Sequence, residues 1–249
     1  AASEASQPPV RLGLRLVSGL TEAAAQRIMA ARQQRPFTTT EDLALRAALD
    51  AGDIRALAAA DALTALSGHR RQQVWDAAAL HRAPELLRTA PTLEAALALP
   101  EAGEGEEIVF DYAATGLTLR RHPLALLRER LARWHLQTAA QLRDLPDGTP
   151  TRACGIVTVR QQPGTAKGVT FVTLEDETGT VNVIVWKALR EAQRSALVHA
   201  RLLAVEGTWQ RSADADGESG GEVRHLIARR LKDLTPLLGN LMTGSRDFR

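Results

Sequence analysis

Apolar residues recur at the spacing of amphipathic helices from about residue 10 to residue 79. One such stretch runs through Ala23, Ile28 and Ala31, and others follow between residues 43 and 74. Glycine or proline interrupts the pattern at four points, which are Gly19, Pro36, Gly52 and Gly68. Several short helices joined by tight turns therefore fit this region better than one long helix.

The helical pattern weakens between residues 81 and 149. Two helical pieces, at 84–89 and 124–136, lie on either side of an acidic loop at 101–107. Thr138, with Gln141 three residues later, has the spacing of a helix N-cap. We therefore expect a mostly helical connector in this part of the chain.

A β-rich texture begins after Pro150. The predicted strands lie between clusters of turn residues, at 156–159, 169–174, 181–186, 202–209 and 222–229. The alternation is clearest at Val181, Val183 and Val185, and the stretch 187–199 has the pattern of a helix. Three strands, a helix and two strands in this order are typical of the five-stranded OB barrel.

The fold class predicted from these patterns is multidomain α + β, with a tandem helix-hairpin-helix α domain, a helical connector and a five-stranded OB-fold β-barrel. The expected boundaries are a linker over 1–9, the hairpin region over 10–80, the connector over 81–149, the barrel over 150–237 and a tail over 238–249.

Composition adds little to this picture. Hydrophobic residues make up 45 % of the chain and charged residues 24 %, which is ordinary for a globular protein, and the net charge is only +2. No apolar run approaches the roughly 20 residues that a membrane span needs, and the first residues lack the pattern of a signal peptide. The single cysteine, Cys154, cannot form an intramolecular disulfide and fits a reducing cytoplasm.

The turn at Ser18, Gly19, Leu20 and Thr21 is the first candidate for DNA contact. A glycine between two short helices allows a tight turn, and it leaves N–H groups at the next helix start that a phosphate oxygen can accept. Such contacts position a duplex without reading its sequence. The alternative is an ordinary helix–helix turn with a capping glycine.

The predicted barrel supplies a second set of candidates. OB barrels bind single strands with cations and with aromatic rings on which bases stack. The residues of these types on or beside the first three strands, the first loop and the fourth strand are Arg160, Lys167, Phe171, Trp186, Lys187 and Arg211. The sequence leaves open whether Phe171 and Trp186 face this groove or fill the barrel interior.

A search for catalytic chemistry identifies no catalytic residue and no metal site. No lysine precedes Lys167, and no lysine lies in the context of an adenylated ligase lysine. Asp214 and Asp216 occur in a glycine-rich stretch without the spacing of a calcium loop. The acidic run at 175–177 fits a hairpin turn that ends at Gly179, and the histidines and Cys154 have no zinc spacing.

Several strings in the sequence are similar to a known family. Residues 10–14, 17–20, 35–37, 42–43 and 68–72 resemble the helix-hairpin-helix region of bacterial C-family DNA polymerases. The strings at 115–128, 163–186 and 245–249 resemble the error-prone, damage-inducible branch of that family, which works in translesion synthesis. The resemblance extends over residues 10–249 and adds Arg70 and Arg71 to the candidates for DNA binding.

The resemblance implies a division of labour. The hairpins would hold duplex DNA behind a polymerase active site, and the barrel would lie near single-stranded template. The catalytic palm carboxylates and their Mg²⁺ would lie outside this chain, which would need no cofactor and be inactive alone. Implied partners are duplex and single-stranded DNA and mutasome proteins, with an indirect link to the sliding clamp and none to a membrane.

Two alternatives stay open at this point. The acidic connector and the tail 239–249 could dock mutasome subunits, with little DNA affinity in the barrel. The barrel could also be a tRNA-binding module of a synthetase, for which the upstream hairpin and the terminal string 245–249 are poor fits.

Overall fold

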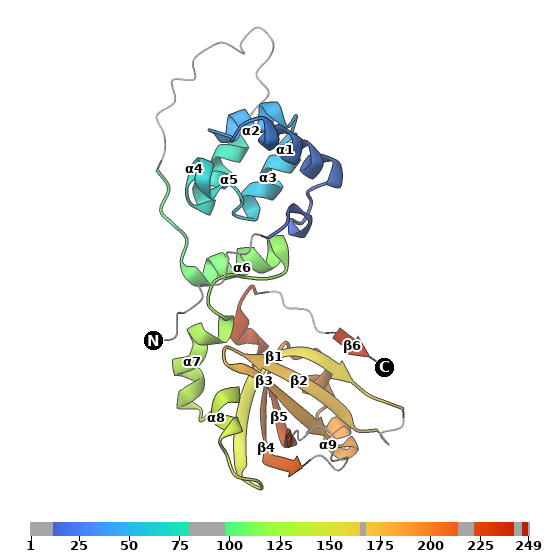
Figure 1. Ribbon diagram of the computed structural model, residues 1–249. Helices are drawn as coiled ribbons and strands as arrows, with labels where there is room; N and C mark the ends of the chain where they lie inside the picture. Colours follow the sequence, from blue (N-terminus) through green and yellow to red (C-terminus); the bar gives the residue numbers. More distant parts are fainter. Residues whose placement is uncertain (1–11, 80–97, 165–167, 214–221, 242–245, 249) are drawn as a thin grey trace, which may run out of the picture. The chain divides into compact units, whose positions relative to one another are not determined.

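The chain folds into two compact units, which are shown in the computed structural model of Figure 1. The structure describes residues 12–79, 98–164, 168–213, 222–241 and 246–248. Residues 1–118 form one unit, called here the helical unit, and residues 119–249 form the other, the barrel unit. This division runs through the predicted connector: its residues 98–118 belong to the helical unit, and residues 119–149 belong to the barrel unit.

The helical unit consists of short helices, as the interrupted apolar pattern predicts. They are η1 (Leu14–Leu16), α1 (Glu22–Gln34), α2 (Thr40–Arg46), α3 (Ala51–Ala59), α4 (Thr64–Ser67), α5 (Arg70–Ala79) and α6 (Glu104–Thr115). Polar side chains mark several of the starts. The Thr21 hydroxyl accepts the Ala24 N–H at 3.1 Å, and Asp50 forms a capping box with Asp53 at the start of α3.

Alanines and branched aliphatic side chains together form the core of the helical unit. The buried residues of this cluster are Ala24, Ile28, Ala31, Leu43, Ala47, Leu49, Ile54, Leu57, Ala58, Leu63 and Ala77. Alanines at helix contacts allow helix axes to approach closely, and α3 packs directly against α5. The packing of the helices against this compact core therefore fixes the positions of the tight turns between them.

The barrel unit contains two helices, a closed barrel and short additions. Its elements are α7 (Pro123–Arg133), α8 (Ala139–Arg143), β1 (Pro150–Gln161), β2 (Thr170–Asp176), β3 (Gly179–Val185), α9 (Lys187–Ala192), α10 (Arg194–His199), β4 (Leu202–Ala213), β5 (Glu222–Asp233), η3 (Thr235–Leu238) and β6 (Arg246–Phe248). Strands pair in the order β2-β3-β5-β4-β1, and β1 also pairs with β2, which closes the barrel. The β3–β5 pair is parallel and the other four pairs are antiparallel. This is the predicted OB fold.

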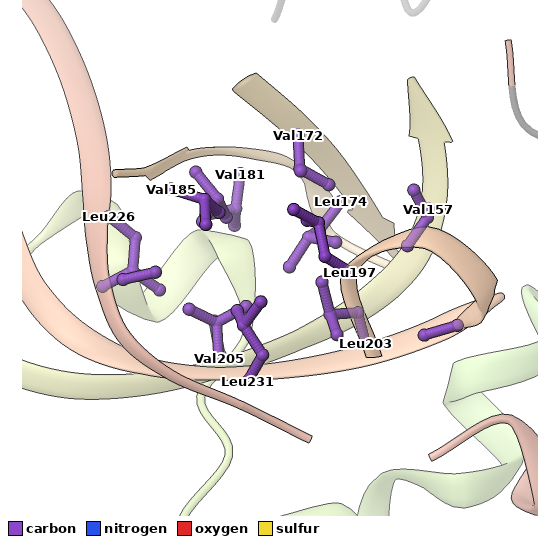
Figure 2. Packing of buried hydrophobic residues seen from close by; sticks show 14 of the residues in the cluster. Val157, Val172, Leu174, Val181, Val185, Leu197, Leu203, Val205, Leu226 and Leu231 are labelled. Carbon is purple, nitrogen blue, oxygen red and sulfur yellow. The ribbon is translucent and has the colours of Figure 1, made fainter. Parts of the chain in front are cut away.

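The barrel interior is filled by the inward residues of all five strands and by the neighbouring helices. Figure 2 shows Val157, Val172, Leu174, Val181, Val185, Leu203, Val205, Leu226 and Leu231 from the strands around Leu197 from α10. Two glycines allow the strands to approach. A Cβ at Gly155 would lie 2.7 Å from the Leu174 Cβ, and one at Gly207 would overlap the Ile227 carbonyl oxygen.

The structure differs from the sequence prediction in three details of the barrel unit. The expected helix at 187–199 is divided at Gln193 into α9 and α10. The predicted tail contains β6, a short strand that pairs parallel to the end of β1. Strand β1 also starts six residues earlier than predicted, at Pro150, because its first half pairs with β4 and only its second half pairs with β2. The predicted cap at Thr138 is confirmed as a capping box with Gln141.

Candidate nucleic-acid interface

The first hairpin turn has the conformation that its glycine predicts. Gly19 has a φ of +83°, in the left-handed region that favours glycine. Ser18 donates its backbone N–H to the Ala114 carbonyl at 2.8 Å, so this amide is used inside the helical unit. The Thr21 hydroxyl accepts from Ala24, which leaves the first-turn amides of α1 before Ala24 for an outside acceptor. Fewer backbone N–H groups are therefore available for a phosphate at this turn than its four residues suggest.

A second turn repeats the first. Gly68, between α4 and α5, also follows a serine and has a φ of +72°. The buried Gln73 fixes this turn, because its side chain donates to the Gly68 carbonyl at 2.7 Å and accepts the Leu63 N–H at 3.1 Å. The sequence prediction treated Gly68 only as a break and a point of resemblance. The repeated Ser-Gly at 18–19 and 67–68 is the signal that could have identified it as a second hairpin.

Arg70, a predicted DNA contact, lies inside the helical unit. Its side chain is only 2 % exposed and pairs with Asp111 and, at 3.1 Å, with Glu107. It also donates to the Glu107 carbonyl at 3.0 Å. A buried guanidinium needs such partners, and these fasten α5 to α6. We therefore remove Arg70 from the DNA-facing set.

Its neighbour Arg71 is at the surface. Arg71 is bonded to Glu106 at 2.6 Å and to the Pro100 carbonyl at 3.3 Å. The hydrogen bond to Glu106 raises the pKa of the Arg71 guanidinium further above its ordinary value. Arg71 thus remains a surface cation whose charge is partly compensated by an acidic neighbour.

Two arginines predicted to contact single strands are also engaged within the protein. Arg160 donates to the Leu197 carbonyl at 2.8 Å and to the Ala200 carbonyl, at the end of α10. Arg211 donates to the Leu145 carbonyl at 3.2 Å, and its backbone N–H donates to Asp147 at 2.8 Å. Both guanidiniums therefore hold the barrel to neighbouring segments, and their contact with a single strand stays a prediction.

The aromatic candidates face outward, which resolves the alternative that the sequence left open. On β2 the even-numbered residues from Thr170 to Asp176 are buried, whereas Phe171 points to the outside and is 38 % exposed. Trp186 follows β3 and is 53 % exposed. Neither ring fills the barrel, whose interior is occupied mainly by aliphatic side chains together with the buried Trp209.

Phe171 belongs to a row of residues that crosses several strands. It pairs with Gln161 of β1 and with Ile184 of β3, and Ile184 pairs with Ile227 of β5. Residues in register on adjacent strands point to the same side of the sheet. We call the outer surface of β2 and β3 around Phe171 and Ile184, together with Trp186 and Lys187, the aromatic face.

Lys187 extends the aromatic face towards the first loop of the barrel. Its side chain is 63 % exposed and lies 4.0 Å from Glu191. A Cβ at Gly168 would lie 3.3 Å from the Lys187 side chain, so the end of the β1–β2 loop is next to this lysine. Lys167, the loop lysine predicted to bind phosphate, lies outside the described residues, as do Asp214 and Asp216.

The acidic run at 175–177 is structural, as predicted. Asp176 accepts the Ala139 N–H at 2.7 Å and the Thr178 N–H at 2.7 Å, which fastens the β2–β3 turn to α8. Glu177 is bonded to Arg128 of α7. Burial raises the pKa of Glu177, but the hydrogen bond from Arg128, a backbone hydrogen bond and the charges of Arg128 and His122 together more than offset this and leave the pKa below its ordinary value. These carboxylates therefore anchor a turn and form no acid–base pair.

The described part of the chain offers neither a metal centre nor a membrane span. No group of three or more His, Cys, Asp or Glu side chains among the described residues is placed to hold a metal ion. No described helix has the length and apolar character needed to cross a bilayer. The surface features assembled above are those of a binding region.

Two family models match the chain. One, described as a helix-hairpin-helix motif, matches residues 1–73, and the other, described as an OB-fold nucleic acid binding domain, matches residues 152–234. The first match lies within the helical unit and the second within the barrel unit.

Curated relatives match almost the whole chain. The Error-prone DNA polymerase of Ralstonia nicotianae is 54 % identical over 245 residues, which are 97 % of this chain and 22 % of the relative. Those of Azoarcus sp. and Methylococcus capsulatus are 54 % and 50 % identical over 97 % and 98 % of this chain. The chain spans about a fifth of the length of these relatives, 22 % in each case.

A solved structure shares only a limited likeness. The asparaginyl-tRNA synthetase from Pyrococcus horikoshii is 25 % identical over 35 % of this chain and 20 % of that chain, with a TM-score of 0.28. A TM-score this low supports no conclusion about the fold or function of this chain. The long, high-identity matches to polymerases favour the polymerase resemblance over the alternative of a synthetase module.

Proposed function

We propose that this chain, which belongs with the error-prone DNA polymerases over the fifth of their length that it spans, is a DNA-binding region whose two units hold different forms of DNA. The helical unit holds duplex through the turns at Gly19 and Gly68, and the barrel unit holds single-stranded template on the aromatic face. The observation that carries the proposal is the outward position of Phe171 and Trp186 on the barrel.

The duplex contact is supported by the two Ser-Gly turns. Each turn has a glycine with a positive φ, and a helix of ten or more residues starts within three residues of each glycine. The amides of such helix starts and their positive dipole ends attract phosphate oxygens. Because backbone amides make these contacts, the binding depends on DNA shape and charge and carries no base preference.

The single-strand contact is supported by exposed rings in a polar setting. Phe171 and Trp186 present aromatic surface to solvent, and Lys187 supplies a cation beside them. Stacking of a base on such a ring contributes about 1–3 kcal/mol and tolerates any base. A template strand of any sequence, including a damaged one, suits a site of this kind.

The remaining roles rest on the family resemblance and are part of the same proposal. The parent protein extends primers across lesions during DNA repair in the bacterial cytoplasm, and its catalytic carboxylates and Mg²⁺ lie in other regions. Alone, this chain has no polymerase activity. Mutasome proteins dock on surfaces that leave the aromatic face open, and the sliding clamp is reached through them.

A two-substrate binding experiment tests the proposal. Gly19→Val and Gly68→Val should each weaken duplex binding, because valine disfavours a positive φ, and should leave single-strand binding nearly unchanged. Phe171→Ala with Trp186→Ala should do the reverse. Circular dichroism checks the fold of each variant. Equal losses on both substrates would contradict the division of labour, and failure of the wild type to bind either DNA would favour the alternative of a protein-docking module.

A further inference from the structure

A second surface of the barrel is hollowed and rich in cations. Two adjoining hollows of about 210 and 410 Å³ lie over β1, β4 and β5, and both are lined by Arg152 and Glu206. Neither is lined by any residue of β2 or β3. In the closed strand order β2-β3-β5-β4-β1, strand β4 lies opposite the β2–β3 pair. This surface, called here the cationic face, therefore lies across the barrel from the aromatic face.

One carboxylate lies between two arginines at the centre of the cationic face. Arg152 of β1 pairs in register with Glu206 of β4, and Glu206 pairs with Arg230 of β5. Only the first two form an ion pair, at 3.1 Å, and both of its side chains remain about half exposed. Arg229 and Lys232 complete the lining, so these described residues carry four fixed positive charges against one negative charge. The surface attracts polyanions.

An exposed tryptophan stands at the edge of this cationic face. Trp134 is 39 % exposed, with the Lys232 ammonium 5.7 Å and the Arg130 guanidinium 5.4 Å from its ring centre. The chain reverses after α7 at His135, which has a φ of +57°, and the Leu136 N–H bonds back to the Leu131 carbonyl at 3.1 Å. Burial of Leu136 holds the reversal, and with it the position of the ring.

We propose that the cationic face is a second binding surface for single-stranded nucleic acid, with phosphates on Arg152, Arg230 and Lys232 and a base against Trp134. Arginine presents a planar fork of donors that fits phosphate oxygens, and Trp beside cations is a stacking platform. An acidic peptide would share the charge but needs apolar pockets as anchors. Here the lining leucines Leu136, Leu231 and Leu234 are buried.

The inference goes beyond the proposed function, because it adds a surface across the barrel from the aromatic face. A strand that reaches both faces would pass around the barrel instead of crossing one side of it. The strand would then make two kinds of contact, one governed by stacking and one governed by charge. The two kinds differ in their response to salt, since only charge contacts release counterions.

The test is a titration of the whole 249-residue chain with a fluorescent oligothymidylate at several salt concentrations. Arg230→Ala with Lys232→Ala should weaken binding roughly tenfold at low salt and reduce the slope of log affinity against log salt by about 1.4. The matched control is Arg32→Ala with Arg55→Ala, which removes the same charge from exposed positions of the helical unit. The control should keep the wild-type slope.

A variant that should bind more tightly separates a binding role of the cationic face from a structural one. Among the described residues that line the two hollows, Glu206 is the one carboxylate, so Glu206→Gln should make the single strand bind about two- to fivefold more tightly. Loss of a structural ion pair alone would leave affinity unchanged or lower it. A polyglutamate peptide is added as a competitor. The salt titration gives the displacement that charge alone would cause, and the peptide should displace the oligonucleotide no more effectively than that.

The outcomes distinguish this inference from the proposed function. The inference would be overturned if Arg230→Ala with Lys232→Ala kept the wild-type slope of log affinity against log salt. Weaker single-strand binding by Glu206→Gln would overturn it as well. Neither result would contradict binding at the aromatic face. Displacement by polyglutamate at far lower concentration than expected would assign the face to an acidic protein segment and overturn the inference as stated. Absence of any single-strand binding by the wild type would overturn both.

Discussion

The two faces of the barrel present opposite chemistry on one scaffold. The outward positions next to Phe171 on β2 and β3 are neutral or aliphatic, with Thr173, Asn182 and Ile184 beside the ring, and Lys187 adds a cation next to Trp186. The outward positions over β4 and β5 carry charge, with Arg230 and Lys232 in register with Glu206 and Ala204. Different strands of one closed barrel carry the two faces, and the same core supports both.

The two faces therefore contribute to the free energy of binding through different interactions. A ring contributes by stacking, which depends little on salt, whereas an arginine contributes by releasing counterions, which depends steeply on salt. A single affinity measured at one salt concentration would mix the two terms. The predictions below separate the faces, beginning with the change that should affect both.

Gly207→Ala should produce the largest effect, because it disturbs the β4–β5 pair, which carries part of the cationic face and belongs to the closed barrel that supports both faces. The new Cβ would overlap the Ile227 carbonyl oxygen between β4 and β5. We expect a loss of about 3 kcal/mol in the free energy of unfolding of the barrel unit, measured by urea denaturation. Gly164→Ala, where a Cβ meets open space, is the control. Equal stability of the two variants would contradict the packing described here.

Replacing both rings of the aromatic face should weaken single-strand binding without changing its salt dependence. For Phe171→Ala with Trp186→Ala we expect a loss of about 2 kcal/mol, or roughly 30-fold in affinity, since two stacking contacts disappear. The salt slope should stay at its wild-type value, because no cation is removed. A reduced slope in this variant would show that the two faces are not separate in the way proposed.

His135→Gly should stabilise the barrel unit by about 0.5–1 kcal/mol in the free energy of unfolding. His135 has a φ of +57°, which glycine adopts without the cost that a side chain adds. If the reversal at His135 positions Trp134, the added backbone freedom should weaken binding at the cationic face slightly while the fold becomes more stable. Thermal unfolding and oligonucleotide titration of the same variant check both parts. A lower melting temperature would contradict this account.

The titration of the Cys154 thiol should leave the free energy of unfolding unchanged at neutral pH and should lower it in alkali. Burial raises the pKa of its thiol to about 12 from the ordinary 9.0, so the folded protein keeps the proton that the unfolded chain loses. Its contribution to stability is therefore complete below pH 9 and is lost as the pH rises towards 12. The wild type should lose more stability over this range than Cys154→Ala does. Reaction of the native thiol with a disulfide reagent at pH 8 should be slow, and fast reaction would show that β1 opens beside Arg152.

The sequence predicted most of the architecture because local patterns determine local structure. Alternating valines at 181, 183 and 185 define a strand with one buried side, and this strand is β3. The Thr138–Gln141 spacing identifies a helix start, because the bonds that satisfy the first amides come from residues within one turn. The backbone of Gly19 was predictable for the same reason.

The candidate sites were predicted less well, because the environment of a long side chain depends on segments that are distant in sequence. Arg70 is buried by acids 37 and 41 positions further along the chain, and Arg160 bonds to carbonyls 37 and 40 positions further along. Arg70 became a candidate for DNA binding through the family resemblance, and Arg160 through its residue type and its place at the end of the first strand. The cationic face was missed altogether, since Trp134, Arg152, Glu206 and Arg230 come from four separate segments.

Short helices joined by tight turns, and the five-stranded barrel after them, could be predicted from the sequence, because spacing, caps and alternation act over a few residues. Which arginines lie inside and which aromatic rings lie outside depended on tertiary packing. The reason is that burial and pairing are set when distant strands close into a barrel. That closure placed Phe171 in solvent and Arg160 under α10, and it brought Arg152, Glu206 and Arg230 into one row.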